Sequence, residues 1–356
     1  MDTMMHHMPA MGDHSACMAG PGMKSINLAL QGGGAHGAFT WGVLDRLLED
    51  ERLAFDGISA TSAGAMNATV MSYGLAAGGR EGAKKALTNF WRRISHAASF
   101  GPLQPSPIDR LRQDHSLSTS PAFVMLDLMT RLMSPYQFNP LNINPLRRVL
   151  LDTVDFEALS RKTCPIKLFL SATNVRSGKV KVFGNEEITP DAVLASCCLP
   201  FLYQAVEIEG EHYWDGGYMG NPAIFPLIYG CNSPDVVVVH INPLHRDTLP
   251  TTATDILNRI NEISFNSSLV REMRAIEFVT RLIEGQHLKG FKRMLIHSIA
   301  ADDVMAGLGV ASKLNAEWGF LTHMRDTGRR HAEVWLESAF DHLGQRSTVD
   351  IAEKFL

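Results

Sequence analysis

A run of four consecutive valines, residues 236–239, constrains the fold of this chain more than any other feature. A strand with one wet face alternates apolar and polar residues, whereas a strand inside a parallel sheet is covered on both faces and is apolar throughout. The valines lie within the strand-like run 235–241. This run therefore predicts an internal strand of a parallel sheet.

Strand-like and helical segments alternate along the rest of the chain. Short β-like runs occur at residues 25–30, 57–60, 166–171, 180–183, 203–208 and 293–299. Helix-like patterns occur at residues 35–49, 62–75, 81–94, 145–159, 190–196, 254–283 and 315–343. This alternation predicts a doubly wound α/β fold.

The composition excludes several classes of protein. A hydrophobic fraction of 45% and a charged fraction of 20% are those of an ordinary globular protein. The net charge of −4 gives no electrostatic basis for binding nucleic acid. No run approaches the ~20 apolar residues that a membrane helix needs. The five cysteines lack a disulfide framework, so we expect a reduced, cytoplasmic setting.

Two segments stand apart in composition. Residues 1–23 are rich in Met and His, which could bind Cu(I), but the interpretation we prefer is a disordered leader. Residues 96–145 are irregular and rich in proline, and they contain an apolar stripe formed by Phe123, Leu126, Met129, Leu132 and Met133. The stripe either packs on the core or forms a lid or lipid-contacting surface, because methionine-rich faces adapt to flexible chains.

A glycine cluster at residues 31–37 lies between an expected strand and an expected helix. Gly32, Gly34 and Gly37 satisfy the G-x-G-x-x-G pattern of dinucleotide-binding folds. That fold needs an acidic residue at the end of the next strand, but here the strand leads into Ser62, and Asp56 precedes it. The alternative is an oxyanion hole, in which backbone N–H groups and a helix N-terminus face a developing negative charge.

Ser62 follows the second expected strand and opens a small-residue helix. This strand–turn–helix context is typical of a nucleophile elbow, in which residues two positions away must be small. Gly64 satisfies this requirement on one side, and Ala60 replaces the usual glycine on the other. The sequence therefore indicates Ser62 as a candidate nucleophile.

A serine nucleophile needs a group that takes its proton. His240, at the end of the valine run, is the candidate for a Ser-His-Asp triad, although a histidine at a strand end is more often structural. The competing candidate is Asp215, in the sequence Asp215-Gly216-Gly217. On turn chemistry alone this sequence predicts only a tight turn.

Three short blocks follow one another along the chain: Gly32-Gly33-Gly34-Ala35-His36-Gly37, Thr61-Ser62-Ala63-Gly64, and Asp215-Gly216-Gly217. Together they resemble the signature of the patatin-like phospholipases, and Gly220-Asn221-Pro222 continues the similarity. The resemblance extends over about residues 26–241, and Ala60 is the departure inside the motifs.

The resemblance implies a patatin-like three-layer sandwich with a mostly parallel central sheet flanked by helices. It also implies a serine–aspartate dyad without histidine, in which Ser62 attacks an acyl carbonyl and Asp215 accepts the proton and later returns it to the leaving alcohol. Because a carboxylate with its ordinary pKa of ~4 is a weak base, the site should desolvate Asp215 or bond it tightly to the serine. This chemistry needs no metal and no cofactor.

Neighbouring residues acquire roles from the same resemblance. The backbone amides of Gly32, Gly33 and Gly34 would hold the oxyanion. His36 occupies a position where the family often has a basic residue, so we expect it to act as an electrostatic helper. The remaining motif residues would support the site: Gly37, Gly64, Gly216 and Gly217.

The resemblance further implies a catalytic domain at residues 24–245, with 96–145 as a lid or insertion, and a mostly helical extension at 246–356 packed on the same domain. The implied substrates are acyl esters of lipids, cleaved by phospholipase A or broader lipid acyl hydrolase activity, with peripheral membrane contact. Two alternatives stay open. One is the same chemistry on a neutral lipid or storage polyester, and the other is a non-catalytic lipid- or dinucleotide-binding protein.

Overall fold

A computed structural model describes residues 22–106, 109, 116–160, 166–285 and 291–356. Residues 1–21 of the expected disordered leader, which the sequence places at residues 1–23, lie outside the described residues. Eight strands form one sheet: β1 (Lys24–Leu30), β2 (Leu53–Ala60), β3 (Lys167–Asn174), β4 (Val180–Gly184), β5 (Val206–Ile208), β6 (Glu211–Asp215), β7 (Asp235–Val239) and β8 (Leu295–Ile299).

The strand order is β5-β6-β3-β2-β1-β7-β8, with β4 also paired to β3. The pairs from β3 through β2, β1 and β7 to β8 are parallel, and the pairs β3–β4, β3–β6 and β5–β6 are antiparallel. The fold is therefore a mixed α/β fold with a mostly parallel sheet, as the sequence predicts. Residues after 245 contribute strand β8 to this sheet as well as helices.

The longer helices are α1 (Gly37–Leu47), α2 (Ala63–Ser99), α4 (Pro121–Leu132), α10 (Ala253–Glu284) and α12 (Trp318–Ala339). Shorter helices are α5 (Pro135–Phe138), α6 (Pro145–Leu151), α7 (Phe156–Ser160), α8 (Pro190–Ser196), α9 (Phe225–Gly230), α11 (Asp302–Ala306) and α13 (Ile351–Phe355). Single 3-10 turns are η1 (Gly34–His36), η2 (Asn185–Glu187), η3 (Gly216–Tyr218), η4 (Val310–Leu314) and η5 (Phe340–His342). Among the described residues, no helix combines the length and the apolar character needed to cross a membrane.

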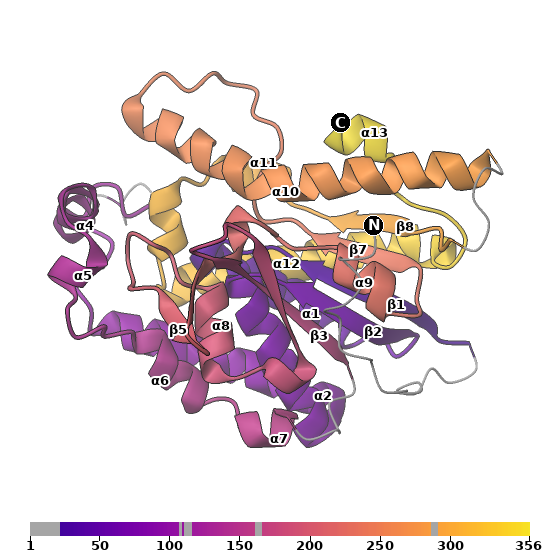
Figure 1. Cartoon of the computed structure of the whole chain (residues 1–356), viewed down its shortest axis with the longest axis horizontal. Coiled ribbons are helices and arrows are strands. Elements are labelled where there is room, and N and C mark those ends of the chain that lie inside the picture. Colours follow the sequence, from indigo (N-terminus) through magenta and orange to yellow (C-terminus); the bar gives the residue numbers. More distant parts are fainter. Residues whose placement is uncertain (1–21, 107–108, 110–115, 161–165, 286–290) are drawn as a thin grey trace.

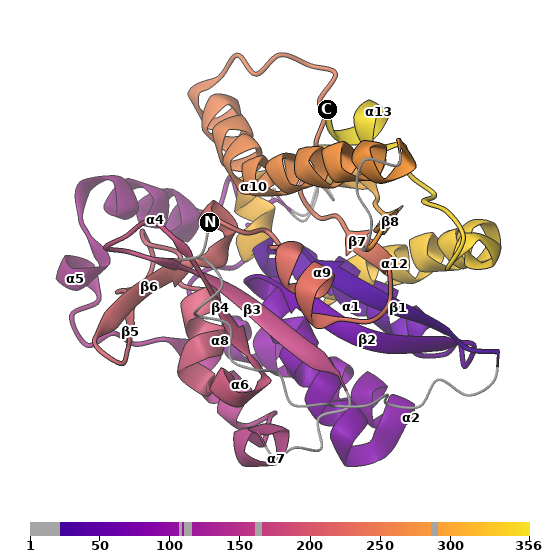
Figure 2. The ribbon, with the colours of Figure 1, turned by 45° about the vertical axis from the view of Figure 1, so that its right-hand side comes forward.

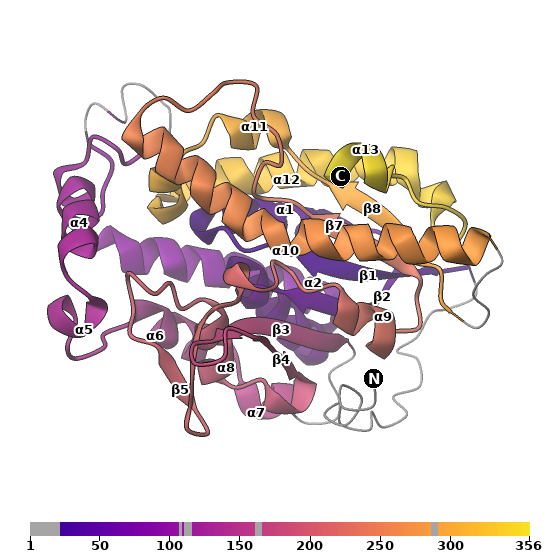
Figure 3. The same ribbon diagram turned by 45° about the horizontal axis from the view of Figure 1, so that its top comes forward.

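Helices cover both faces of the sheet (Figures 1 and 2). Helices α1, α2 and α12 lie on one face, and α9, α10 and α13 lie on the other. Figure 3 shows α10 lying across β1 and β7. This arrangement confirms the predicted three-layer sandwich.

The four valines of β7 join the two cores. Val237 and Val239 pack in the core formed with α1 and α12, whereas Val236 and Val238 pack in the core formed with α9 and α10. All four are fully buried because each face of β7 is covered by helices. The apolar run is thus explained by a strand that has no wet face.

The segment predicted to be irregular contains the helices α4 and α5, which lie at one end of the molecule in Figures 1 and 3. No residue of α4 is buried, and Leu132 is 74% exposed. Within the stripe, Phe123, Leu126 and Met129 are half-buried, whereas Leu132 and Met133 are exposed. Its helical spacing creates an apolar face, but spacing alone does not determine what covers that face.

Helices α1 and α12 cross with their backbones almost in contact. A Cβ added at Gly42 of α1 would overlap the carbonyl of Arg325, and one added at Gly328 of α12 would overlap the carbonyl of Phe39. Glycine at both positions lets α12 approach α1, whose N-terminus follows the glycine loop. The crossing therefore fixes the position of α1, and the candidate site lies at the N-terminal end of this helix.

We expect Gly42→Ala and Gly328→Ala each to lower the free energy of unfolding by about 1–3 kcal/mol, because the new methyl must push the helices apart. Gly319→Ala, on the same helix α12 with no atom near its Cβ position, is the matched control. It should be neutral or stabilising by up to about 1 kcal/mol. Urea denaturation measures all three, and equal effects at positions 319 and 328 would contradict this description of the crossing.

Candidate active site

Ser62 occupies a sharp turn between β2 and α2. Its backbone has φ 54° and ψ −124°, a left-handed conformation that is strained for a residue with a side chain. The turn is fixed by hydrogen bonds from Thr61 N to Leu30 O (3.2 Å) and from Gly64 N to Thr61 O (2.9 Å). A Cβ at Gly64 would overlap the backbone of β1, so a small residue is required there. Ala60 is accommodated, fully buried, as the last residue of β2.

The two edges of strand β3 explain how Asp215 comes close to the turn at Ser62. Strand β4 pairs along one edge, and β2 pairs along the other until it ends with Ala60 opposite Leu170. Beyond that point β6 takes the edge that β2 has left, and Asp215 pairs with Ala172. Asp215 therefore lies where the chain of β2 turns away into Ser62.

The carboxyl group of Asp215 is completely buried. Its Oδ1 accepts a hydrogen bond from Gly217 N (2.7 Å), and its backbone is held by Cys198 and Thr173. Its Oδ2 is buried and makes no hydrogen bond to any described residue. One carboxylate oxygen is thus fixed in place, and the other has lone pairs that can accept a proton.

Burial raises the pKa of Asp215 to about 6, because the charged carboxylate loses its hydration. The Gly217 amide, the Ser62 side chain and the positive charge of Lys313 oppose this rise. The Cβ position of Gly216, the residue after Asp215, lies 3.0 Å from the side chain of Thr61, so the turns at Ser62 and Asp215 are adjacent. A carboxylate with a pKa of about 6 is a stronger base than an ordinary aspartate and is still ionised at neutral pH.

The glycine loop lies directly against the elbow. A Cβ at Gly32 would be 2.6 Å from Ser62 Cβ, and one at Gly37 would be 2.6 Å from Ala63 Cβ. Gly34 has φ +59° and packs against the backbone of Lys313. These approaches explain why side chains are absent from the loop.

The three expected oxyanion donors are not equivalent. Gly32 N donates to Asn221 Oδ1 (2.7 Å), so the prediction of Gly32 as a donor is corrected: this amide fixes the loop instead. The N–H groups of Gly33 and Gly34 donate to no acceptor in the described part of the chain. Only Gly33 and Gly34 therefore keep amides for an oxyanion.

His36 does not supply the positive charge expected of it. Its side chain is buried, and burial together with the charge of Lys313 lowers its pKa to about 3. The neutral ring pairs through Nε2 with Ser312 Oγ (2.8 Å) and contacts Phe320 edge-on. The correction has a physical reason, because a buried imidazole without a carboxylate partner cannot remain protonated.

A comparison with protein families matches the model described as patatin-like phospholipase over residues 28–228, which is more than half of the chain. The chain belongs to the patatin-like phospholipase family. The matched region contains the glycine loop, the elbow at Ser62 and the Asp215-Gly216-Gly217 turn. The family predicted from the three blocks is thereby confirmed.

Comparison with solved structures relates this patatin-like protein to the crystal structure of VipD from Legionella pneumophila. The similarity covers 93% of this chain and 72% of that chain, with 13% sequence identity and a TM-score of 0.44. A search of curated proteins finds no match. The family assignment therefore rests on the match over residues 28–228.

Three residues outside the sequence blocks also hold this patatin-like site together. Ser196 Oγ accepts the Ser62 N–H (2.9 Å), and Asn242 Nδ2 donates to Gly32 O (2.9 Å). Lys313 Nζ donates in turn to Asn242 Oδ1 (2.8 Å). None of them lies in a recognisable motif, and only the folded chain brings them to the loop.

His240 is buried, and neither of its ring nitrogens has a hydrogen-bond partner among the described residues. Its ring lies against Phe355 of α13, with the centroids 5.5 Å apart. Burial and the charge of Lys354 lower its pKa to about 3. His240 therefore lacks the carboxylate partner and the contact with Ser62 that a triad requires.

Gly216 and Gly217, which follow Asp215, allow neighbouring elements to approach the turn closely. A Cβ at Gly216 would overlap the carbonyl of Ser171 in β3, and one at Gly217 would overlap the ring of Phe265 in α10. These approaches hold the turn that follows Asp215 between the sheet and α10. The described residues contain no group of three or more His, Cys, Asp or Glu side chains that could hold a metal ion.

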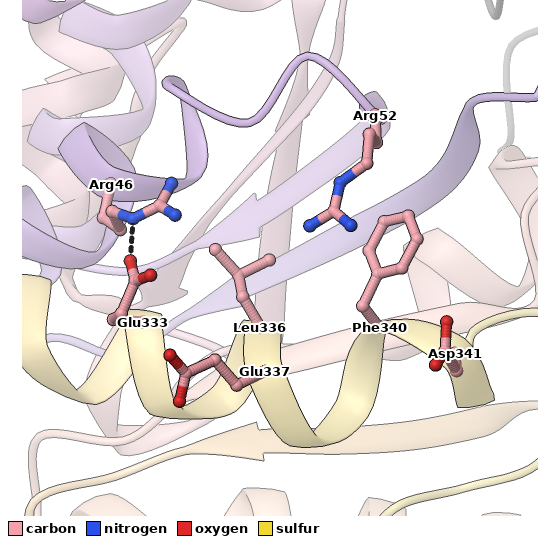
Figure 4. A pocket seen from close by; sticks show the side chains of 7 residues that line it. All are labelled: Arg46, Arg52, Glu333, Leu336, Glu337, Phe340 and Asp341. Carbon is pink, nitrogen blue, oxygen red and sulfur yellow. Dashed lines mark hydrogen bonds and ion pairs between the residues drawn. The ribbon is translucent and has the colours of Figure 1, made fainter.

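A surface cavity elsewhere on the molecule contains none of the predicted site residues (Figure 4). It is lined by residues at the end of α1, before β2 and along α12: Arg46, Arg52, Glu333, Leu336, Glu337, Phe340 and Asp341. Arg46 pairs with Glu333 there, and Arg52 lies over the ring of Phe340. Arg52 precedes the first residue of β2, Leu53, whereas Ser62 follows the last one. This cavity therefore lies at the opposite end of the strands from the candidate site.

We expect Asp215→Asn to stabilise the fold at pH 8 but not at pH 4. The pKa of Asp215 is higher in the folded than in the unfolded chain, so wild-type stability falls as pH rises through about 6. Asparagine keeps an oxygen for the Gly217 amide and carries no charge, and it should gain up to about 3 kcal/mol at pH 8. Denaturation at both pH values measures this gain, and a pH-independent difference would contradict it.

Proposed function

We propose that this patatin-like protein is a serine hydrolase that cleaves acyl esters of lipids through Ser62 and Asp215. The family makes lipid acyl hydrolysis the general activity. The observation that carries the finer proposal is the desolvated carboxyl group of Asp215, which meets a serine held on a strained turn. The strained turn exposes the hydroxyl at the end of the sheet, and desolvation strengthens the base beside it.

In the proposed reaction, Ser62 Oγ attacks the acyl carbonyl while Asp215 Oδ2 accepts the serine proton. The tetrahedral intermediate collapses when the same proton passes to the leaving alcohol, which leaves an acyl-serine. Water then attacks the acyl group while Asp215 accepts a proton from it, and Asp215 passes this proton to Ser62 Oγ as the fatty acid leaves. Each proton transfer uses the carboxylate oxygen that has no other partner.

We assign the stabilisation of the negative charge on the carbonyl oxygen to the backbone amides of Gly33 and Gly34. Their freedom from other acceptors supports this role, whereas Gly32 N is already bonded to Asn221. Preorganised backbone donors of this kind typically contribute about 10²–10³ to kcat. The loop is held rigid because Gly32 is bonded on its N–H side by Asn221 and on its carbonyl side by Asn242.

A lipid substrate is supported by the apolar side chains that α4 exposes. Val124, Met125 and Leu128 are each more than half exposed, which is an unusual density of apolar surface on a short helix. Such a surface suits acyl chains or peripheral contact with a membrane, and we retain both as part of the proposal. The chemistry of the dyad is the same for a neutral lipid or a storage polyester.

A fluorophosphonate probe should label the wild type and fail to label Ser62→Ala, because the probe needs an activated serine. Asp215→Asn should slow labelling by about 10²-fold or more through loss of the base. Gel fluorescence with the purified proteins measures both rates. Labelling that persists in Ser62→Ala would refute Ser62 as the nucleophile.

His240→Leu is the matched control for the triad alternative. It removes a buried ring whose nitrogens have no partner, so it should leave the fold and the labelling rate close to those of the wild type. A loss of labelling in His240→Leu, with retained thermal stability, would favour the triad instead.

The rate of labelling should rise with pH through an acid limb near pH 6. Asp215 must be ionised to accept the proton, and its pKa is raised to about 6. The labelling rate from pH 4.5 to 7.5, with Asp215→Asn as the variant that lacks the limb, measures this dependence. A flat profile in the wild type would contradict the assignment of the base.

Product analysis after incubation with a mixed lipid extract distinguishes the substrates. Release of fatty acid from phospholipid supports phospholipase A activity, and release from neutral lipid or polyester supports the alternative. Binding to liposomes without release from any ester would instead indicate a non-catalytic lipid-binding protein. The Ser62→Ala protein serves as the blank in each assay.

A further inference from the structure

The 3-10 turn η4 packs against the glycine loop from the C-terminal part of the chain. Ser312 bonds the ring of His36, and the carbonyl of Lys313 lies against Gly34. Both residues lie outside the region 28–228 that matches the family. A segment far along the chain therefore forms the back of the proposed oxyanion hole.

Lys313 brings a cation to this position, and its Nζ lies 5.9 Å from the centroid of the Phe265 ring. Its ammonium donates to a neutral acceptor, Asn242 Oδ1 (2.8 Å), and forms no ion pair within the described part of the chain. The nearby carboxylate of Glu262 is occupied by Arg246 and Arg259. The positive charge of Lys313 is therefore not neutralised by a direct partner.

Asn242 connects this charge to the loop. Its Nδ2 donates to Gly32 O (2.9 Å), and its backbone N donates to Gln31 Oε1 (3.0 Å). An ammonium on the amide oxygen polarises the amide and strengthens the bond that its N–H makes to Gly32. The charge thus acts on the loop through two consecutive hydrogen bonds.

We propose that Lys313 is a positioning residue for the acyl-transfer reaction: through Asn242 it holds the glycine loop, and its charge stabilises the oxyanion bound there. This inference rests on the proposed function. It assigns to Lys313 the positive charge that His36, being neutral, does not provide. A fixed cation behind the loop favours an anionic transition state, since charges interact strongly where water is excluded.

The charge of Lys313 also makes activity depend on pH. Burial lowers the pKa of Lys313 to about 8. The charged groups that act on it are Glu262, Arg246 and Asp215. Around the dyad, burial raises the pKa values of Cys198 and Tyr218 to about 12, raises the pKa of Cys197 well above its ordinary value, and raises the pKa of Asp215 to about 6. We therefore expect activity to fall above about pH 8, where Lys313 loses its charge.

Three variants separate charge from packing. Lys313→Gln keeps a donor for Asn242 but removes the charge, and Lys313→Arg keeps the charge at every accessible pH. Lys354→Gln is the matched control, because the Lys354 ammonium also donates to a neutral oxygen, Ser298 Oγ (2.9 Å), and Ser298 lies in β8, which β7 separates from β1 and the glycine loop. Hydrolysis of a soluble p-nitrophenyl ester, fluorophosphonate labelling and thermal denaturation are measured for each.

We expect kcat and the labelling rate of Lys313→Gln at pH 7 to fall about tenfold or more, with KM within about twofold. Lys313→Arg should restore most of the rate and lack the alkaline limb that the wild type shows near pH 8. Lys354→Gln should resemble the wild type.

Wild-type rates in Lys313→Gln would overturn the inference, as would an alkaline limb unchanged in Lys313→Arg. If Lys313→Gln does not fold, the limb in Lys313→Arg decides the question by itself. The proposed function itself would be overturned if the wild type neither reacted with the probe at Ser62 nor cleaved the ester. That result is distinct from the outcomes for the Lys313 variants.

Discussion

The shared edge of strand β3 is the constraint on which the rest of the site depends. Strand β2 leaves this edge after Ala60, and β6 enters it with Asp215 opposite Ala172. Backbone pairing, rather than any contact between the side chains, therefore places the carboxyl group beside the turn at Ser62. The hydrogen-bonded register fixes the backbone of the proposed base, and the Gly217 amide then orients its carboxyl group.

Burial has opposite consequences for the different titratable groups around this edge. It raises the pKa of Asp215 toward neutrality, lowers that of Lys313 and leaves His36 uncharged, because each charged form loses its hydration. A buried carboxylate that is ionised at neutral pH costs folding stability and provides a stronger base. In the proposed reaction, the region around the loop thus exchanges stability for reactivity, as many enzyme sites do.

The local sequence correctly predicted the type and order of elements whose residues all have the same kind of surroundings. The valines of β7, the glycine loop and the elbow at Ser62 all belong to elements with the predicted type and order. The helix α4 was not predicted, and the sequence left two interpretations of its stripe open, because helical spacing specifies an apolar face but not its partner. Gly32 and His36 were assigned roles by resemblance, and their actual hydrogen-bond partners, Asn221 and Ser312, come from distant segments.

The sequence by itself determined the family, the α/β architecture and the residues expected to react, because each depends on short-range chemistry: small residues at a strained turn, apolar strands and glycines before a helix. The tertiary structure decided which groups are charged, which amides are left without acceptors, and that Lys313 lies behind the loop. These properties depend on burial and on contacts between segments up to several hundred residues apart. No local pattern encodes them, since desolvation and hydrogen-bond partners exist only once the chain has folded.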